Sequence, residues 1–223
     1  MEGVKLSVSV ERDKPLLDGG AYLRVLTERE SGDAHIANAI RRQLELTDRV
    51  DITKPHVVSF DVRIDRLGAF DKRNDRFIIC SSSDPTAMAT VEPTSGWNIR
   101  IAGEDHGGGK ARHWRFVSGD RKGREVRVDS RIPATENTPY SFRITVDPEA
   151  RRWTPSLSVD GGPWTTFKPM GMRMAGNARE CGYWPFLYLW CMLDGVDNGD
   201  EREFVEFSID SIRIVPSEEK AKK

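Results

Sequence analysis

A short acidic stretch near the C-terminus carries the oxygen ligands that a hard metal ion prefers. The four side chains concerned are Asp194, Asp197, Asn198 and Asp200. Calcium takes roughly six to eight oxygen ligands, many of them carboxylates. The spacing differs from that of an EF-hand loop, and Asp, Asn and Gly are also the usual residues of tight turns. The stretch therefore predicts either a calcium site or an ordinary turn, and no other cofactor is expected.

Two histidines flank the glycine-rich stretch Gly107–Lys110, whose three consecutive glycines predict a loop. These are His106 and His113, and the arginines near them are Arg100, Arg112 and Arg115. A histidine base, with an arginine to neutralise a uronate, would suit a β-elimination. The alternative is a pair of ordinary surface histidines beside a loop.

The segment Trp184–Leu193 is apolar at both parities, which indicates a strand covered on both sides or one whose second face binds something apolar. The aromatic positions are Trp184, Phe186, Tyr188 and Trp190, and the alternate positions are Leu187, Leu189, Cys191 and Leu193. If the leucines face the core, the aromatic rings could stack against sugar rings. If both faces are buried, the aromatic residues are ordinary core.

Strict alternation of apolar and polar residues predicts a long central strand at His56–Arg66. The apolar positions, expected to face the core, are Val58, Phe60, Val62 and Ile64, and the positions expected on the wet face are Asp61, Arg63 and Asp65. Two carboxylates beside a cleft could do acid–base work on a glycosidic bond. The pattern favours the simpler interpretation, a solvated ladder of cross-strand charges.

The remaining chain also favours strands over helices. Strands are predicted at Val4–Val10, Ala21–Thr27, Arg76–Ser82, Trp97–Ala102, Ala111–Ser118, Arg124–Ser130, Tyr140–Asp147, Arg151–Asp160 and Glu203–Val215. His35–Leu46 fits either a helix or a strand, and its neighbours favour a strand. The segment Trp164–Glu180 has no clear period and predicts a long irregular loop.

The last predicted strand changes phase near its middle. Val205, Phe207 and Ile209 share one parity, whereas Ile212 and Ile214 share the other. A β-bulge between the two groups would keep all five side chains on the core side.

The composition excludes several functional classes. The 223 residues carry 34 basic and 35 acidic side chains, a net charge of −1, which argues against bulk attraction to nucleic acid or to an anionic membrane. No apolar run is long enough for a membrane span, and the N-terminus lacks the apolar core of a secretory signal. The protein is therefore expected outside the cytoplasm, extracellular or periplasmic, only if a signal or a parent chain has been removed. Cys80 and Cys191 lie in apolar strands and predict buried thiols, with a disulfide as the alternative. Cys181 makes the number of cysteines odd.

These observations predict an all-β protein, an antiparallel two-sheet β-sandwich, with one domain over residues 1–216 and a solvated tail at 217–223. The segments that carry a family resemblance are SFDVRID (59–65), YSFRITVDPEARRW (140–153), SLSVDGG (156–162) and FSIDSIRIVP (207–216). They resemble the concanavalin A-like lectin/glucanase superfamily, including laminin-G-like bacterial jelly-roll domains. The resemblance implies two curved sheets and a concave face that in relatives often holds a glycan.

The resulting hypothesis is a carbohydrate-binding or accessory domain that recognises a polysaccharide on its concave face. Its candidate ligand-binding residues are Trp184, Tyr188, Trp190, Asp61, Arg63, Asp65, His106 and His113. The alternatives are a polysaccharide lyase or glycoside hydrolase on the same scaffold, and a structural or interaction domain without a sugar ligand. The Glu-x-Asp-x-x-Glu strand of the superfamily's hydrolases is absent, and Glu203–Glu206 is only a partial match, so no catalytic residue is assigned. The expected partner is a glycan, with no nucleic acid and no membrane span, and the sequence leaves the oligomeric state open.

Overall fold

The structure is a computed structural model. It describes residues 4–17, 19–29, 36–43, 50–68, 76–82, 95–102, 112–119, 125–172, 186–193 and 203–217. All regular elements of these residues are β-strands, which pair antiparallel throughout. None of the described residues forms a helix with the length and apolarity of a membrane span.

The strands form two sheets. Sheet A has the order β1 (Val4–Glu11), β2 (Tyr22–Arg29), β14 (Glu203–Pro216), β4 (His56–Gly68), β9 (Pro139–Asp147), β10 (Arg152–Val159) and β11 (Thr165–Thr166), with β12 (Met170–Gly171) also paired to β10. Sheet B has the order β3 (Ile36–Gln43), β13 (Phe186–Leu193), β5 (Arg76–Ser82), β6 (Ser95–Ala102), β7 (His113–Gly119) and β8 (Glu125–Pro133). The prediction of an antiparallel two-sheet β-sandwich is confirmed.

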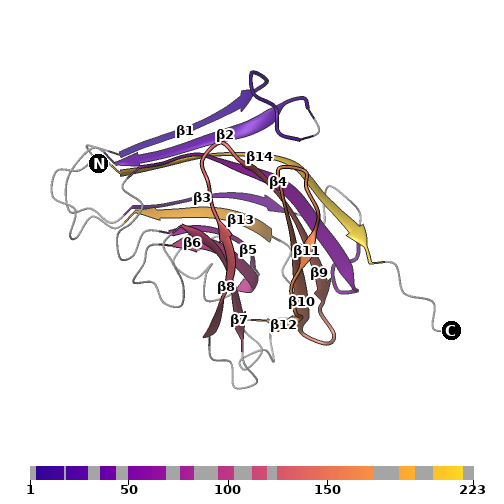
Figure 1. The fold of residues 1–223 in the computed structure, drawn as a ribbon. Coiled ribbons are helices and arrows are strands. Elements are labelled where there is room, and N and C mark those ends of the chain that lie inside the picture. Colours follow the sequence, from indigo (N-terminus) through magenta and orange to yellow (C-terminus); the bar gives the residue numbers. More distant parts are fainter. Residues whose placement is uncertain are drawn as a thin grey trace.

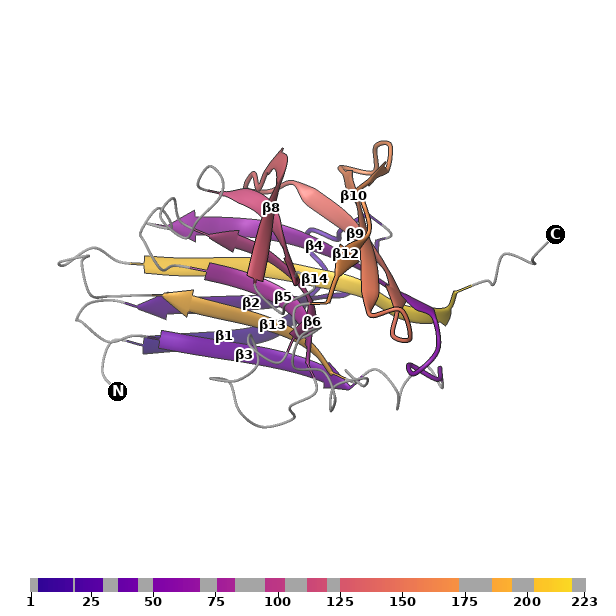
Figure 2. The same cartoon turned by 90° about the horizontal axis from the view of Figure 1, so that it is seen from below.

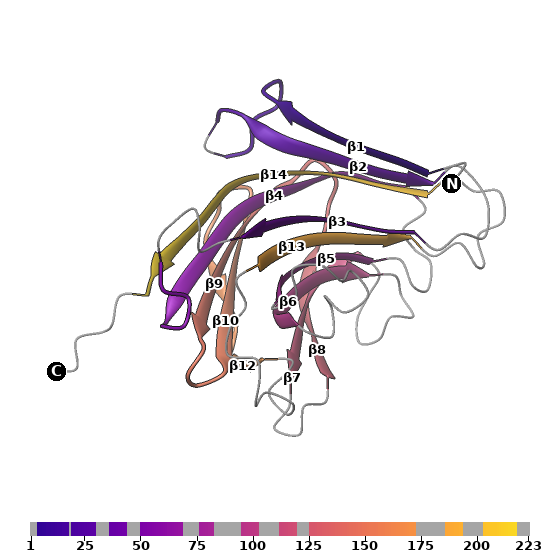
Figure 3. The same ribbon diagram turned by 180° about the vertical axis from the view of Figure 1, so that it is seen from behind.

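The two sheets are curved and nested. Sheet A bends around sheet B, so the face of sheet B that is turned away from sheet A is concave (Figures 1 and 3). Seen from below, the axes of the long strands β14, β13 and β3 are nearly aligned, with β13 antiparallel to β3 (Figure 2). This aligned stacking is typical of β-sandwiches.

The core lies between the sheets, and β4 contributes its centre. Val58, Phe60, Val62 and Ile64 are at most 1% exposed, as their alternation predicts. Aromatic rings from both sheets meet over this strand. Phe142 of β9 stacks on Phe60 at 5.3 Å between ring centroids and meets the edge of Trp114 of β7 at 4.9 Å. Burial of each such ring contributes about 1.5–3 kcal/mol.

The predicted phase change in β14 is a β-bulge. Asp210 pairs with Asp61 and Arg213 pairs with Ser59, so β14 holds one residue more than β4 between the two pairs. Ser211, within the bulge, has a φ of 55°. The bulge keeps Ile209 and Ile214 buried in the core, and it turns Arg213 to the outside.

Other local predictions have different outcomes. Residues 36–43 form strand β3, as the neighbouring elements favoured. The prediction of a wholly irregular segment after Trp164 was wrong, because β11 and β12 form there along the edge at β10. Cys80 and Cys191 are buried, as predicted. Cys181 lies outside the described residues.

The prediction of a wet outer face for β4 was also wrong. Asp61, Arg63 and Asp65 do face away from the core, but they are only 8%, 6% and 8% exposed. The N-terminal segment covers Arg63: the Lys14 carbonyl accepts a hydrogen bond from Arg63 Nη1 at 2.7 Å, and the Tyr22 ring lies 5.3 Å from the Arg63 guanidinium. The solvated charge ladder is therefore a buried polar network.

Candidate functional site at the concave face of sheet B

A row of charged side chains crosses the concave face of sheet B. The strand register places Arg100 of β6 beside Arg115 of β7, and Arg115 beside Asp129 of β8. In β7 these positions alternate with Trp114 and Phe116, which belong to the core. The arginines predicted near the glycine-rich loop are thus brought together on the face that the resemblance indicates.

His113 and Asp129 form a pair at the β8 end of this row. His113 Nδ1 lies 3.1 and 3.2 Å from the two carboxylate oxygens of Asp129. An ionised carboxylate can only accept hydrogen bonds, so the Nδ1 atom carries the proton and donates it. Nε2 of the neutral ring is then left with its lone pair. The side chains are 18% and 21% exposed, so solvent reaches the pair.

Irregular backbone positions this pair. Between the pairs His113–Pro133 and Arg115–Asp129 the register shifts, because β8 contains extra residues there. Arg131, one of these, has a φ of 62° and donates its N–H to Asp129 Oδ1 at 2.7 Å. Arg112, which precedes the histidine, has a φ of 58°. Such bulges and left-handed residues gather beside functional sites, where they aim a side chain.

The charges on this face shift the pKa values of their neighbours. Burial raises the pKa of Asp129, but the Arg131 N–H, His113 and Arg115 outweigh burial and hold that pKa below its usual value. Burial lowers the pKa of Arg115, against the opposing charge of Asp129. The lowered pKa favours the ionised form of Asp129, which is the form that accepts from the His113 ring.

Further polar groups continue the row toward β6. Glu125 Oε1 accepts from Arg127 Nε at 2.5 Å and lies 3.9 Å from Arg100 Nη2. Asn98 Oδ1 accepts from Arg100 Nε at 3.3 Å. The Asn98 side-chain amide nitrogen is buried, and it has no hydrogen-bond partner in the described part of the chain. A buried donor of this kind is uncommon and is compatible with a polar ligand at this face.

The predicted aromatic strand also belongs to sheet B. Its backbone places Tyr188 opposite Cys80 and Trp190 opposite Ile78. Leu187 and Leu189 face the core, as expected. The side chains of Tyr188 and Trp190 lie outside the described part, so sugar stacking on them stays a prediction. Ile78 and Cys80 are fully buried, so the middle of this face is covered.

The candidate residues do not gather at one place. Asp61, Arg63 and Asp65 lie on sheet A, on the opposite side of the sandwich from His113. The candidates outside the described residues are Trp184, His106, Asp194, Asp197, Asn198 and Asp200. Within the described residues, no group of acidic, histidine or cysteine side chains could hold a metal ion.

Sequence reasoning missed three members of the row, Glu125, Arg127 and Asp129. Their period of two within the predicted strand at 124–130 already placed them on one face. Which strand would lie beside them depends on pairing, and the sequence does not specify this.

No protein-family model matches the chain, and a search of curated proteins finds no match. Among solved structures, the chain is similar to a GH131 β-glucanase catalytic domain from Podospora anserina, with a TM-score of 0.60, 10% identity, and coverage of 97% of this chain and 86% of that one. It is similar to alginate lyase A1-II′, with a TM-score of 0.50, 11% identity, and coverage of 95% and 84%. It is also similar to part of a sialidase, with a TM-score of 0.52, 11% identity, and coverage of 96% of this chain and only 17% of that one.

The fold and these likenesses define the class of protein. The chain is a jelly-roll β-sandwich, a fold that it shares with catalytic domains of carbohydrate-active enzymes. At 10 or 11% identity the likeness establishes the fold. The activity must be argued from the residues, because one fold hosts many functions.

Proposed function

We propose that the chain binds an acidic polysaccharide at the β7–β8 end of the concave face of sheet B. The observation that supports this most directly is the imidazole of His113, held by Asp129 at 3.1 Å beside the guanidinium of Arg115. The fold adds support, since the similar structures include an enzyme named for alginate.

The chemistry of the row suits an acidic sugar. Arg127, 31% exposed, can donate to a carboxylate from outside the sheet. Asp129 and Glu125, both 21% exposed, can accept from sugar hydroxyls. Arg100 and Arg115, on the neighbouring strands, are fully buried and contribute positive potential rather than direct contact.

Affinity electrophoresis in gels containing alginate, with a neutral β-glucan in a parallel gel, tests the proposal. Retardation is expected in alginate and not in the neutral gel. Arg127→Gln should weaken binding roughly tenfold, about 1.4 kcal/mol. Arg152→Gln, an exposed arginine on β10 of sheet A, removes the same charge elsewhere and should change binding little. Equal loss in both variants would mean that net charge alone carries the attraction.

A second candidate function, β-elimination at a uronate, is favoured by the proton position in the His113–Asp129 pair. Nε2 of His113 would take the proton from the carbon next to the carboxylate, and the bond from the adjacent carbon to the glycosidic oxygen would then break. The leaving oxygen would gain a proton, and the new chain end would be unsaturated. Release of unsaturated ends from alginate, lost in His113→Gln, would favour this function over simple binding.

A third hypothesis is a structural or interaction domain without a sugar ligand. It would be favoured if neither acidic nor neutral glycans bind. The calcium site at Asp194, Asp197, Asn198 and Asp200 remains a separate proposal, which rests on the ligand chemistry of those side chains.

A further inference from the structure

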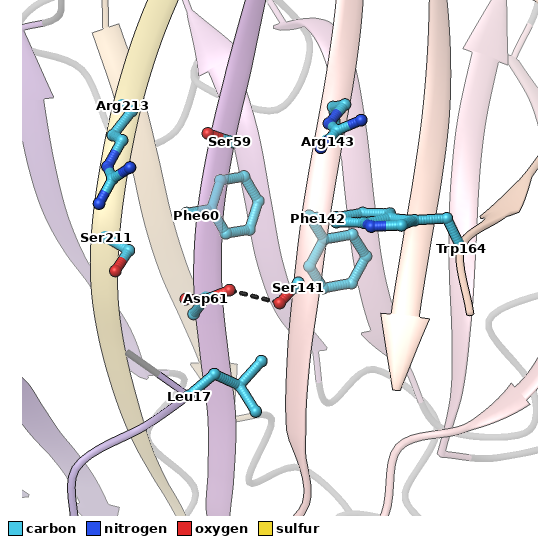
Figure 4. Close-up of a pocket in the computed structure, with 10 residues that line it drawn as sticks. All are labelled: Leu17, Ser59, Phe60, Asp61, Ser141, Phe142, Arg143, Trp164, Ser211 and Arg213. Atoms are coloured by element: carbon cyan, nitrogen blue, oxygen red, sulfur yellow. Dashed lines mark hydrogen bonds between the residues drawn. The ribbon is translucent and has the colours of Figure 1, made fainter. Parts of the chain in front are cut away.

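A pocket of about 290 Å³ opens on the outer face of sheet A, on the other side of the sandwich from the His113 row. The residues of its wall that matter here are Ser59, Asp61, Ser141, Arg143, Trp164 and Arg213 (Figure 4). Sites for small organic ligands usually measure roughly 300–1,000 Å³. The pocket therefore has room for a single ring-sized group rather than for a long segment of a polymer.

Three neighbouring strands position two cations at one end of the pocket. Arg213 of β14 pairs with Ser59 of β4, and Ser59 pairs with Arg143 of β9. The two arginines therefore lie two strand spacings apart, about 10 Å between backbones. Both are exposed, and the bulge at Ser211 is the reason that Arg213 faces outward. Without the extra residue, Arg213 would take the parity of the core.

Trp164 supplies an aromatic wall. It is 43% exposed, and the Arg143 guanidinium lies 4.6 Å from its ring centroid. Figure 4 shows the indole edge-on, with Arg143 toward one face and Ser141 and Asp61 toward the other. The cation–π contact orients the ring and leaves its second face toward the pocket.

Hydrogen-bonding groups lie below that second face. Ser141 Oγ donates to Asp61 Oδ1 at 2.5 Å, and Asp61 is 8% exposed. The remaining lone pairs of the Asp61 carboxylate and of the Ser141 hydroxyl can accept from the hydroxyls of a sugar. Flat C–H surfaces of sugar rings pack on indole, and arginine binds carboxylates in a planar, bidentate manner.

We propose that this pocket is a second glycan-binding site, which takes one acidic sugar residue with its ring against Trp164 and its carboxylate between Arg143 and Arg213. The site stands independently of the function proposed for sheet B, because it uses a different sheet and different residues. If both sites bind, one chain could engage two segments of polysaccharide, and avidity would exceed the affinity of either site.

Titration with sodium glucuronate, followed by the indole N–H signals in an NMR spectrum, tests the proposal on the whole chain. The Trp164 signal among the six tryptophans is identified by its loss in Trp164→Phe. Glucuronate in the millimolar range should shift this signal to saturation, and glucose should bind at least tenfold more weakly. Arg143→Gln and Arg213→Gln should each weaken the glucuronate response about tenfold, and the unchanged signals of the other tryptophans should show that the variants fold.

Arg127→Gln is the matched control on sheet B and should leave the Trp164 response intact. A Trp164 signal that does not move, or that responds to glucose as strongly as to glucuronate, overturns the second site. A response to glucuronate that is as strong in both arginine variants as in the wild type also overturns it. Weaker alginate retardation in Arg127→Gln with an intact Trp164 response supports both sites separately. Failure of the sheet B proposal would appear in the alginate gels, and failure of the second site would appear in the Trp164 signal, so the two failures can be told apart.

Discussion

Arg63 Nε donates to Asp65 Oδ1 at 2.6 Å, and both side chains are nearly buried on the outer face of sheet A, at 7% and 11% exposure. Ser208 Oγ donates to the second carboxylate oxygen at 2.5 Å. The N-terminal segment is joined to this pair through the Lys14 carbonyl. The polar side chains of β4, which were expected in solvent, therefore belong to a covered network. This network holds the N-terminal segment against sheet A.

Asp65→Asn tests how much this network contributes to the stability of the fold. The variant keeps the volume of the side chain but leaves the buried Arg63 guanidinium without its counter-charge. We expect the free energy of unfolding in urea to fall by about 3 kcal/mol, because breaking a buried ion pair leaves an uncompensated charge. Arg66→Gln is the control in the same strand: Arg66 pairs with Glu206 but is 52% exposed, and its loss should cost less than about 1 kcal/mol. Similar losses in the two variants would contradict the difference in burial.

Truncating a core ring should lower the free energy of unfolding far more than truncating a side chain on an edge strand. Phe142 is fully buried between Phe60 and Trp114, so Phe142→Ala should cost about 3–5 kcal/mol. Val10 is 70% exposed on β1, so Val10→Ala should stay within about 0.5 kcal/mol of the wild type. Urea denaturation of both variants measures the contrast, and a large loss for Val10→Ala would show that another surface covers β1.

This contrast also shows which features of the fold can be predicted from the sequence. Val10 alternates with polar neighbours in the same way as Val62, and both patterns correctly predict strands. Only the position of β1 at the edge of sheet A makes Val10 exposed. The bulge in β14 was predictable, because the change of phase between Ile209 and Ile212 is local.

The candidate sites depend on contacts between distant segments. His113 could be chosen from the sequence, but its partner Asp129 could not, because the pairing of β7 with β8 includes an irregular register. Likewise, no pattern along the chain joins Trp164 to Arg213 across four strands. Periodicity along a strand indicates which face of the sheet a side chain takes. The pairing of distant strands decides which side chains lie beside it.

His56 predicts a pH dependence of stability. The ring is 6% exposed, and burial lowers its pKa below the ordinary 6.5, although the Lys54 carbonyl, which accepts from Nδ1 at 2.8 Å, acts in the opposite direction. As the pH falls below 6.5, the unfolded chain binds the proton before the folded chain does. The His56 contribution to stability is therefore complete above pH 6.5 and is lost below it, at up to about 1.4 kcal/mol per pH unit.

His56→Gln provides the comparison for this dependence. Glutamine can still donate to the Lys54 carbonyl, but it does not titrate. Urea unfolding at several pH values between neutral and mildly acidic conditions should give a flatter profile for the variant than for the wild type. Parallel profiles would mean that His56 titrates alike in the folded and unfolded states.

Calcium binding at the acidic stretch would appear as added stability. A ligand that binds only the folded chain, at about 100 times its Kd, stabilises that chain by about 2.7 kcal/mol. We expect the unfolding free energy to rise in calcium relative to EDTA, and this rise should disappear in Asp197→Asn. Magnesium, which favours fewer ligands and a stricter geometry, is the control ion. The same stability in calcium and in EDTA would exclude the site.

Asp129→Asn separates a positioned histidine from an incidental one. In the wild type, Asp129 accepts from His113 Nδ1 and from the Arg131 N–H. Asparagine can keep its oxygen on the Arg131 N–H, but it then turns an N–H toward the imidazole. The ring proton should therefore move from Nδ1 to Nε2, which nitrogen chemical shifts of the His113 ring would record.

The loss of the Nε2 lone pair has a different consequence for each proposed function. A β-elimination that uses Nε2 as its base should slow by roughly 100-fold or more, the usual contribution of a general base. Binding of alginate through Arg127 should change much less, because the variant keeps the pair between Arg127 and Glu125. A His113 ring with the same tautomer in both proteins would show that Asp129 does not set the proton, and the elimination hypothesis would then lose its structural support.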